Sequence, residues 1–138
     1  MTTIAKSEQE RLLKEAEKVS ERAYAPFSKF FVGCAILTSD GKTYLGCNVE
    51  NSSYGLTNCA ERTAIFTAIA DKSDGKKLDI KAVAVVNRDG VSCAPCGACR
   101  QVIFEFGPNA VVIYRGENGE AVQTPITELL PVGFRLEK

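Results

Sequence analysis

Residues 80–114 read IKAVAVVNRDGVSCAPCGACRQVIFEFGPNAVVIY, and this stretch decides the fold. Its first part, Ile80 to Asn87, is an apolar run that predicts a strand buried on both faces. A helix is expected to begin near Cys96 and to end at Gly107-Pro108, a common stop signal. Ala110 to Tyr114 predicts the next strand. This succession of strand, helix and strand indicates an α/β protein.

Two more helices are predicted on the N-terminal side of this stretch. Ser7, with Glu three residues later, matches a capping box and opens a first helix. That helix should run to Tyr24, because Pro26 disfavours helix in the residue before it. Asn58 is expected to cap a second helix that continues through Ala70.

The remaining elements complete one sheet. Residues 30–49 predict two strands of a hairpin that turns at Gly41, since glycine supplies the positive φ that such turns need. Residues 121–123 add a short strand, and Thr124-Pro125 opens a last helix with Thr124 as its cap. We therefore predict one domain, residues 1–138, with an α/β fold in which a mixed five-stranded sheet carries helices on both faces.

The charge balance restricts the partners of this protein. It has 17 basic and 17 acidic side chains, so its formal net charge is zero. Proteins that grip a phosphate backbone normally have a basic excess, so no nucleic-acid partner is expected. No apolar stretch has the length of a membrane span or the pattern of a signal peptide. We expect a cytoplasmic protein that acts on a small neutral substrate.

The chain has no histidine but has six cysteines, and three of these are spaced like zinc ligands. Cys96 and Cys99 share one face of a helix, and two zinc–sulfur bonds of about 2.3 Å can span the gap between them. Cys59, on a different helix, can supply the third ligand. Three protein ligands leave one coordination position for water, which is typical of catalytic zinc.

Two charged residues follow Cys59 closely. Glu61 is the candidate proton carrier of a hydrolytic reaction. Arg62 lies three residues after Cys59 on the same helical face, where it can donate a hydrogen bond to the thiolate. We interpret Arg62 as the residue that offsets the excess negative charge of three thiolates around one zinc ion.

Three other interpretations fit parts of this pattern. Cys-x-x-Cys alone is typical of a redox pair. Cys93 or Cys47 can complete a closed structural zinc site as a fourth ligand. Glu61 can be no more than the capping-box partner of Asn58.

Residues 59–65, CAERTAI, and residues 95–101, PCGACRQ, together resemble the small three-cysteine cytidine deaminases of pyrimidine salvage. The resemblance extends over nearly the whole chain, as far as Phe134. It implies the three-layer α/β/α fold of that family, one Zn²⁺ ion per chain and a homotetramer. The implied reaction is hydrolytic deamination of cytidine and 2′-deoxycytidine to uridine and 2′-deoxyuridine.

The resemblance also implies a role for each matching residue. Glu61 would shuttle protons next to a zinc ion bound by Cys59, Cys96 and Cys99. The implied substrate contacts come from Phe30, Asn48, Val49, Glu50, the Ala60 backbone N–H and Phe134. Of these, Asn48 and Glu50 would hold the ribose hydroxyls, while Phe134 would reach the site of a neighbouring subunit. Tyr54 resembles a residue near subunit contacts.

Rival functions share the metal motif. One is deamination of a cytosine-containing antibiotic, as in blasticidin-S deaminase, against which Arg62 and the Asn48–Glu50 pair favour a nucleoside. Another is deamination of nucleic acid, against which the neutral charge argues. A zinc-stapled binding module is the non-enzymatic alternative. Ala94 departs from the family pattern, in which Ser commonly precedes the proline.

Overall fold

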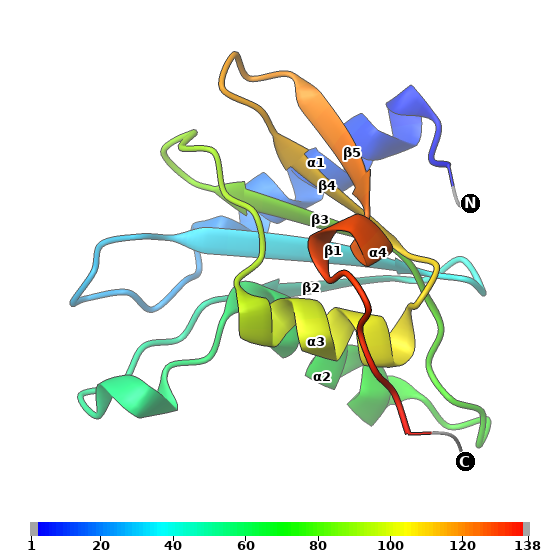
Figure 1. Ribbon diagram of the computed structural model, residues 1–138. Coiled ribbons are helices and arrows are strands. Elements are labelled where there is room, and N and C mark those ends of the chain that lie inside the picture. Colours follow the sequence, from blue (N-terminus) through cyan, green and yellow to red (C-terminus); the bar gives the residue numbers. More distant parts are fainter. Residues whose placement is uncertain (1–2, 137–138) are drawn as a thin grey trace.

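The computed structural model describes residues 3–136 and is built around one five-stranded sheet. The strands are β1 (Val32–Thr38), β2 (Thr43–Cys47), β3 (Ile80–Asn87), β4 (Val111–Arg115) and β5 (Ala121–Pro125). Their order is β2-β1-β3-β4-β5 (Figure 1). β3 and β4 pair in parallel, whereas the other neighbours are antiparallel. The predicted mixed sheet is therefore confirmed.

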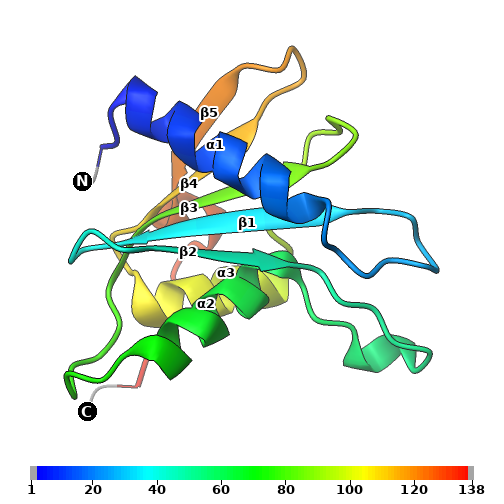
Figure 2. The same ribbon diagram turned by 180° about the vertical axis from the view of Figure 1, so that it is seen from behind.

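Helices cover both faces of the sheet. α1 (Lys6–Ser20) lies across one face, which is turned to the viewer in Figure 2. α2 (Ala60–Asp71) and α3 (Gly97–Phe106) cover the other face, and the short α4 (Ile126–Leu129) follows β5 (Figure 1). The loop before α2 contains a 3₁₀ helix, η1 (Tyr54–Leu56). This confirms the predicted three-layer α/β/α arrangement.

No helix within residues 3–136 combines the length and the apolar character that crossing a membrane requires.

The burial of β1 explains why both faces need cover. All seven of its residues are buried. Successive side chains of a strand point to opposite faces of the sheet. Cys34 and Ile36 accordingly belong to the core under α2 and α3, whereas Ala35 and Leu37 belong to the core under α1. A continuous apolar run is what a central strand between two helical layers requires.

The ends of α1 differ from the prediction. Its N-cap is Ala5, and no side chain bonds to the cap, so the predicted capping box at Ser7 is wrong. The helix ends at Ser20 and not at Tyr24. Tyr24 pairs instead with the segment after β2, where its backbone N–H donates to the Asn48 carbonyl at 3.0 Å.

The N-caps of α2 and α4 also differ from the prediction. Cys59, not Asn58, is the N-cap of α2, because the Asn58 amide donates to Thr63 Oγ1 at 3.0 Å instead of capping the helix. Pro125, not Thr124, is the N-cap of α4. Thr124 and Pro125 both belong to β5 and pair with β4, so α4 begins only after this strand has ended.

Two glycines let helices approach the sheet closely. A Cβ on Gly33 of β1 would lie 1.9 Å from the Ala16 carbonyl oxygen of α1. A Cβ on Gly46 of β2 would lie 2.4 Å from the Ala64 backbone nitrogen of α2. In both places the helix backbone occupies the space that a side chain would need.

We expect Gly33→Ala to lower the free energy of unfolding by about 3 kcal/mol, because α1 must move away from the sheet to accept the methyl group. Urea unfolding followed by circular dichroism measures this change. Gly55→Ala is the matched control, because no atom of the described residues lies within 4 Å of a Cβ at that position. Equal stability of the two variants would contradict the close packing of α1 on β1.

The sheet brings the starts of α2 and α3 together. Gly33 of β1 pairs with Cys47 of β2 on one side and with Val86 of β3 on the other. Since β1 is antiparallel to both neighbours, β2 and β3 end at the same edge of the sheet. α2 follows β2 and α3 follows β3 along the chain, so both helices begin beside this edge.

Candidate metal centre and substrate cavity

Three cysteines meet where α2 and α3 begin. Cys59 is the N-cap of α2, Cys96 is the N-cap of α3, and Cys99 lies in the first turn of α3. Their Sγ atoms all lie within 4.8 Å of one another, and those of Cys59 and Cys96 are 3.9 Å apart. A tetrahedral zinc ion with bonds of about 2.3 Å holds two sulfurs about 3.8 Å apart. The cluster therefore fits a zinc ion.

The cluster has three protein ligands. Among residues 3–136, no fourth Cys, His, Asp or Glu has a ligand atom within this group. Cys47 lies on β2, and Cys93 lines a neighbouring cavity without joining the cluster. The closed four-cysteine site that was the structural alternative is thus not formed by the described residues. A fourth coordination position is left for a ligand from outside the protein.

Arg62 supplies positive charge to this cluster, as its spacing from Cys59 predicts. Its Nη2 donates to Cys59 Sγ at 3.2 Å. Its Nε is buried and has no hydrogen-bond partner among residues 3–136. A half-buried guanidinium with a buried, unpaired donor is best stabilised when the sulfurs beside it are anionic, as they are around a bound metal ion.

Hydrogen bonding between the thiols separates their acidities. The hydrogen bond from Cys99, assisted by Arg62 and opposed by burial, lowers the pKa of Cys59 to about 5. The same hydrogen bond, together with burial, raises the pKa of Cys99. Metal binding to this cluster therefore releases protons, as is usual for thiolate sites.

Glu61 is buried beside the cysteines. It lies in the first turn of α2, is 4 % exposed and lines the same cavity as Cys59 and Cys96. Burial raises the pKa of the Glu61 carboxyl to about 7, and the charge of Cys59 adds to this effect. A carboxyl group with a pKa near neutrality can both accept and donate a proton. Because Asn58 caps no helix, the interpretation of Glu61 as its capping-box partner is wrong.

A cavity of about 410 Å³ opens next to Glu61. Of the remaining predicted contact residues it contains Phe30, Asn48, Glu50 and Ala60. Its volume lies in the range of small-molecule sites and suits a ligand of nucleoside size. Phe30 is 40 % exposed, so it forms a wall of the cavity and is not a core residue.

Asn48 joins the end of β2 to the start of β1. Its Oδ1 accepts from the Val32 backbone N–H at 2.9 Å, and its Nδ2 donates to the Phe30 carbonyl at 2.8 Å. An amide group has two donor hydrogens and two acceptor lone pairs, so each end retains one free valence. Asn48 therefore fixes the backbone on both sides of Phe31 and can still accept one hydrogen bond and donate one.

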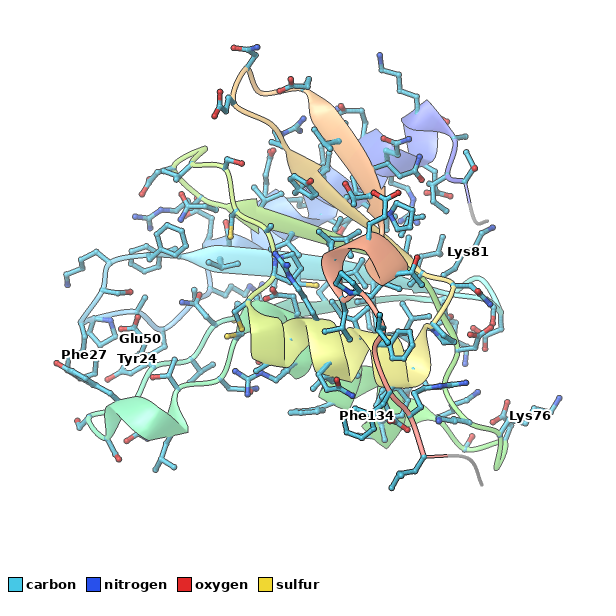
Figure 3. All side chains as sticks on the ribbon, in the orientation of Figure 1. Tyr24, Phe27, Glu50, Lys76, Lys81 and Phe134 are labelled. Carbon is cyan, nitrogen blue, oxygen red and sulfur yellow. The ribbon has the colours of Figure 1, made fainter. Side chains whose placement is uncertain are left out.

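Three predicted residues lie outside this cavity. Val49 is 44 % exposed, and its backbone pairs with that of Asn58. Phe134 lies beside α3, far from Glu50 in Figure 3, and its carbonyl accepts from Gln101 Nε2 at 3.1 Å. Tyr54 is 74 % exposed. The structure does not bring these side chains to the cavity of their own chain.

Comparison with known proteins places this geometry in a family. Residues 6–115 match the model of the cytidine and deoxycytidylate deaminase zinc-binding region. The chain belongs to this deaminase family. Because the three clustered cysteines lie within the matched residues, we assign the cluster as the zinc site.

Similar proteins extend over most of the chain. A cytidine deaminase of Sporosarcina psychrophila is 48% identical over 129 residues, which are 93% of this chain and 92% of that protein. The crystal structure of the cytidine deaminase from Burkholderia pseudomallei superimposes with a TM-score of 0.79 at 47% identity, over 91% of this chain and 98% of that one. For the Mycobacterium tuberculosis cytidine deaminase the TM-score is 0.79 at 35% identity, with 92% and 97% covered.

Proposed function

We propose that this protein catalyses the hydrolytic deamination of cytidine and 2′-deoxycytidine, which yields uridine or 2′-deoxyuridine and ammonia in pyrimidine salvage. The observation that carries the proposal is a buried carboxyl group, Glu61, in a cavity beside a zinc site with three protein ligands. Similar proteins over most of this chain are named cytidine deaminases. We propose that residues 1–138 act as one deaminase domain.

The reaction needs an activated water and a proton carrier. Cys59, Cys96 and Cys99 would hold one Zn²⁺ ion, which as a Lewis acid activates water at neutral pH for attack on the amino-bearing ring carbon. Glu61 would take a first proton from this water on its carboxylate and deliver it to the adjacent ring nitrogen. It would then take the second proton of the former water, as the new carbonyl forms, and pass it to the amino group, which leaves as ammonia. Its burial and its pKa of about 7 suit a group that must take up and release protons in turn.

The cavity offers contacts for the remainder of a nucleoside. The Ala60 backbone N–H is at the start of α2, where helices have unpaired donors, and would bind the ring carbonyl. Phe30 would pack against the pyrimidine or the sugar. Asn48 and Glu50, which also line the cavity, would bind the ribose hydroxyls. Neither nucleic acid nor a membrane is a partner in this proposal.

The pair Asn48 and Glu50 also favours a nucleoside over a cytosine-containing antibiotic, because paired polar groups suit a sugar diol. Loss of cytidine ultraviolet absorbance, with uridine identified by chromatography, tests the proposal. We expect turnover of cytidine and a much lower rate on blasticidin S. Turnover of the antibiotic alone would favour that rival, and bound zinc without turnover of either compound would favour a non-enzymatic zinc module.

We expect Arg62→Gln to weaken zinc affinity by about 10- to 100-fold, the usual cost of losing a residue that orients a metal ligand. The reason is that its hydrogen bond to Cys59 Sγ, 3.2 Å long, stabilises the thiolate. Competition with a chromophoric chelator measures the affinity. Arg11→Gln is the control, because Arg11 lies on α1 and pairs with Glu8. Equal zinc affinity of the two variants would reject this role.

We also propose that the protein assembles as a homotetramer in the cytoplasm. Phe66 and Ile69 are 48% and 40% exposed on α2, which leaves an apolar face without cover in the single chain. Phe134 and Tyr54, which lie outside α2, are exposed as well and would contact neighbouring subunits. A zinc site of free thiols suits a reducing compartment. Light scattering should give the mass of four chains, and a monomer at micromolar concentration would contradict the assembly.

A further inference from the structure

Ser28 lies between Glu50 and Phe30, two of the residues proposed to contact the nucleoside. It belongs to the loop between α1 and β1 and lines the cavity together with Phe30 and Glu50. Its hydroxyl donates to Glu50 Oε2 and accepts from the Phe30 backbone N–H at 3.0 Å. One hydroxyl group therefore connects the carboxylate on one side of the cavity to the backbone of the aromatic residue on the other.

The Glu50 carboxylate is held almost entirely by this loop. Its Oε1 accepts from the backbone N–H groups of Phe27 and Ser28 at 3.0 and 3.2 Å, and its Oε2 accepts from the Ser28 hydroxyl. Hydrogen bonding to Ser28 lowers the pKa of Glu50, so the group is ionised at neutral pH. A carboxylate has about four lone-pair positions, so one position on Oε2 is free for another donor. Figure 3 shows Glu50 close to Phe27 in this loop.

The loop holds a backbone conformation that L-residues rarely adopt. Lys29 has φ 58°, in the left-handed region, which costs a non-glycine residue on the order of 1 kcal/mol. The hydrogen bonds of Ser28 and Phe30 flank this residue, and the Lys29 N–H itself donates to the Ala25 carbonyl at 3.0 Å. Such a conformation persists only where its surroundings fix it.

We propose that Ser28 is a positioning residue for substrate: its hydroxyl aims the free lone pair of Glu50 Oε2 at the ribose hydroxyls. Ser28 does not need to touch the reacting atoms. The inference rests on the proposed nucleoside deaminase function and adds a specificity element to it. Without the hydroxyl, Oε2 keeps no hydrogen-bond partner among residues 3–136 to fix its direction, while Oε1 retains its two backbone bonds.

Kinetics of Ser28→Ala test this role. We expect KM for cytidine to rise by about tenfold with kcat within about twofold, because one hydrogen bond to a charged group is lost from binding and none from the chemistry. Ser28→Thr retains the hydroxyl and should restore KM to within about twofold of the original. Ser39→Ala removes a similarly exposed hydroxyl far from the cavity, where it donates to the Asp79 carbonyl, and should leave both constants unchanged.

Two further measurements separate orientation of Glu50 from a general effect on folding. With 2′,3′-dideoxycytidine, which lacks the 2′- and 3′-hydroxyls, Ser28→Ala should change the ratio kcat/KM by less than about twofold. In a double-mutant cycle with cytidine as the substrate, adding Ser28→Ala to Glu50→Gln should likewise lower kcat/KM by less than about twofold, because the two residues act as a unit. An equal loss on both substrates, an additive double variant or an unchanged KM would overturn the proposal. If the unmodified protein does not deaminate cytidine, the proposed function fails instead.

Discussion

Glu61→Gln is expected to lower kcat for cytidine by about 10²- to 10⁴-fold, the usual contribution of a proton-transfer group. Glutamine has nearly the same shape as glutamate but carries no proton between water and substrate. Glu61 is 4% exposed and lines the cavity next to Cys59 and Cys96, so bulk water is poorly placed to replace it. Steady-state turnover of cytidine, measured with zinc content, gives the result.

The same variant should fold and keep its metal. Burial raises the pKa of Glu61 to about 7, so the carboxylate is disfavoured at this position and a neutral amide should cost little stability. Glu105→Gln is the control on α3, where Glu105 is half-exposed and pairs with Lys77 on the surface. If Glu61→Gln retains more than about a tenth of the activity, Glu61 is not the proton shuttle.

Cys59→Ser is expected to abolish binding of the one zinc ion per chain. Turnover of cytidine should be lost with it. A serine hydroxyl is not ionised near neutral pH, so the site loses a thiol whose pKa is lowered to about 5. Because bound metal stabilises only the folded state, we also expect the melting temperature to fall by about 10 °C. Metal analysis and calorimetry of the same preparation measure both effects.

Cys47→Ser provides the matched control for this loss. Cys47 is a half-buried free thiol on β2, outside the cluster of Cys59, Cys96 and Cys99. The Cys47→Ser protein should retain one zinc ion per chain and full turnover of cytidine. A Cys59→Ser protein with normal zinc content would mean that the metal is bound elsewhere.

The regular elements were predictable because their signals are local. Residues 80–87 predict a strand, and β3 spans Ile80–Asn87. Helix ends were harder, because capping is a competition between neighbours. Asn58 has the right side chain to cap α2, yet it bonds to Thr63, and that preference depends on how the loop approaches the helix. Tyr24 lies outside α1 because its backbone pairs with that of Asn48, a contact between distant segments.

The metal site follows from spacing, whereas the hydrogen bonding of Glu50 does not. Cys96 and Cys99 lie on one helix, and Arg62 follows Cys59 by three residues, so helix geometry alone relates them. Ser28 and Glu50 are 22 positions apart, and nothing in a single sequence links a loop serine to that carboxylate. The direction of the Glu61 side chain was also undetermined, because it depends on where α2 begins.

Zinc titration of the metal-free protein tests the central claim most directly. The claim is that three thiolates hold one zinc ion with a position left for substrate water, next to Glu61. We expect cytidine turnover to be absent without metal and to rise in proportion to added zinc, with a break at one ion per chain. Turnover that is complete without zinc, or full zinc loading with no turnover, would contradict the account.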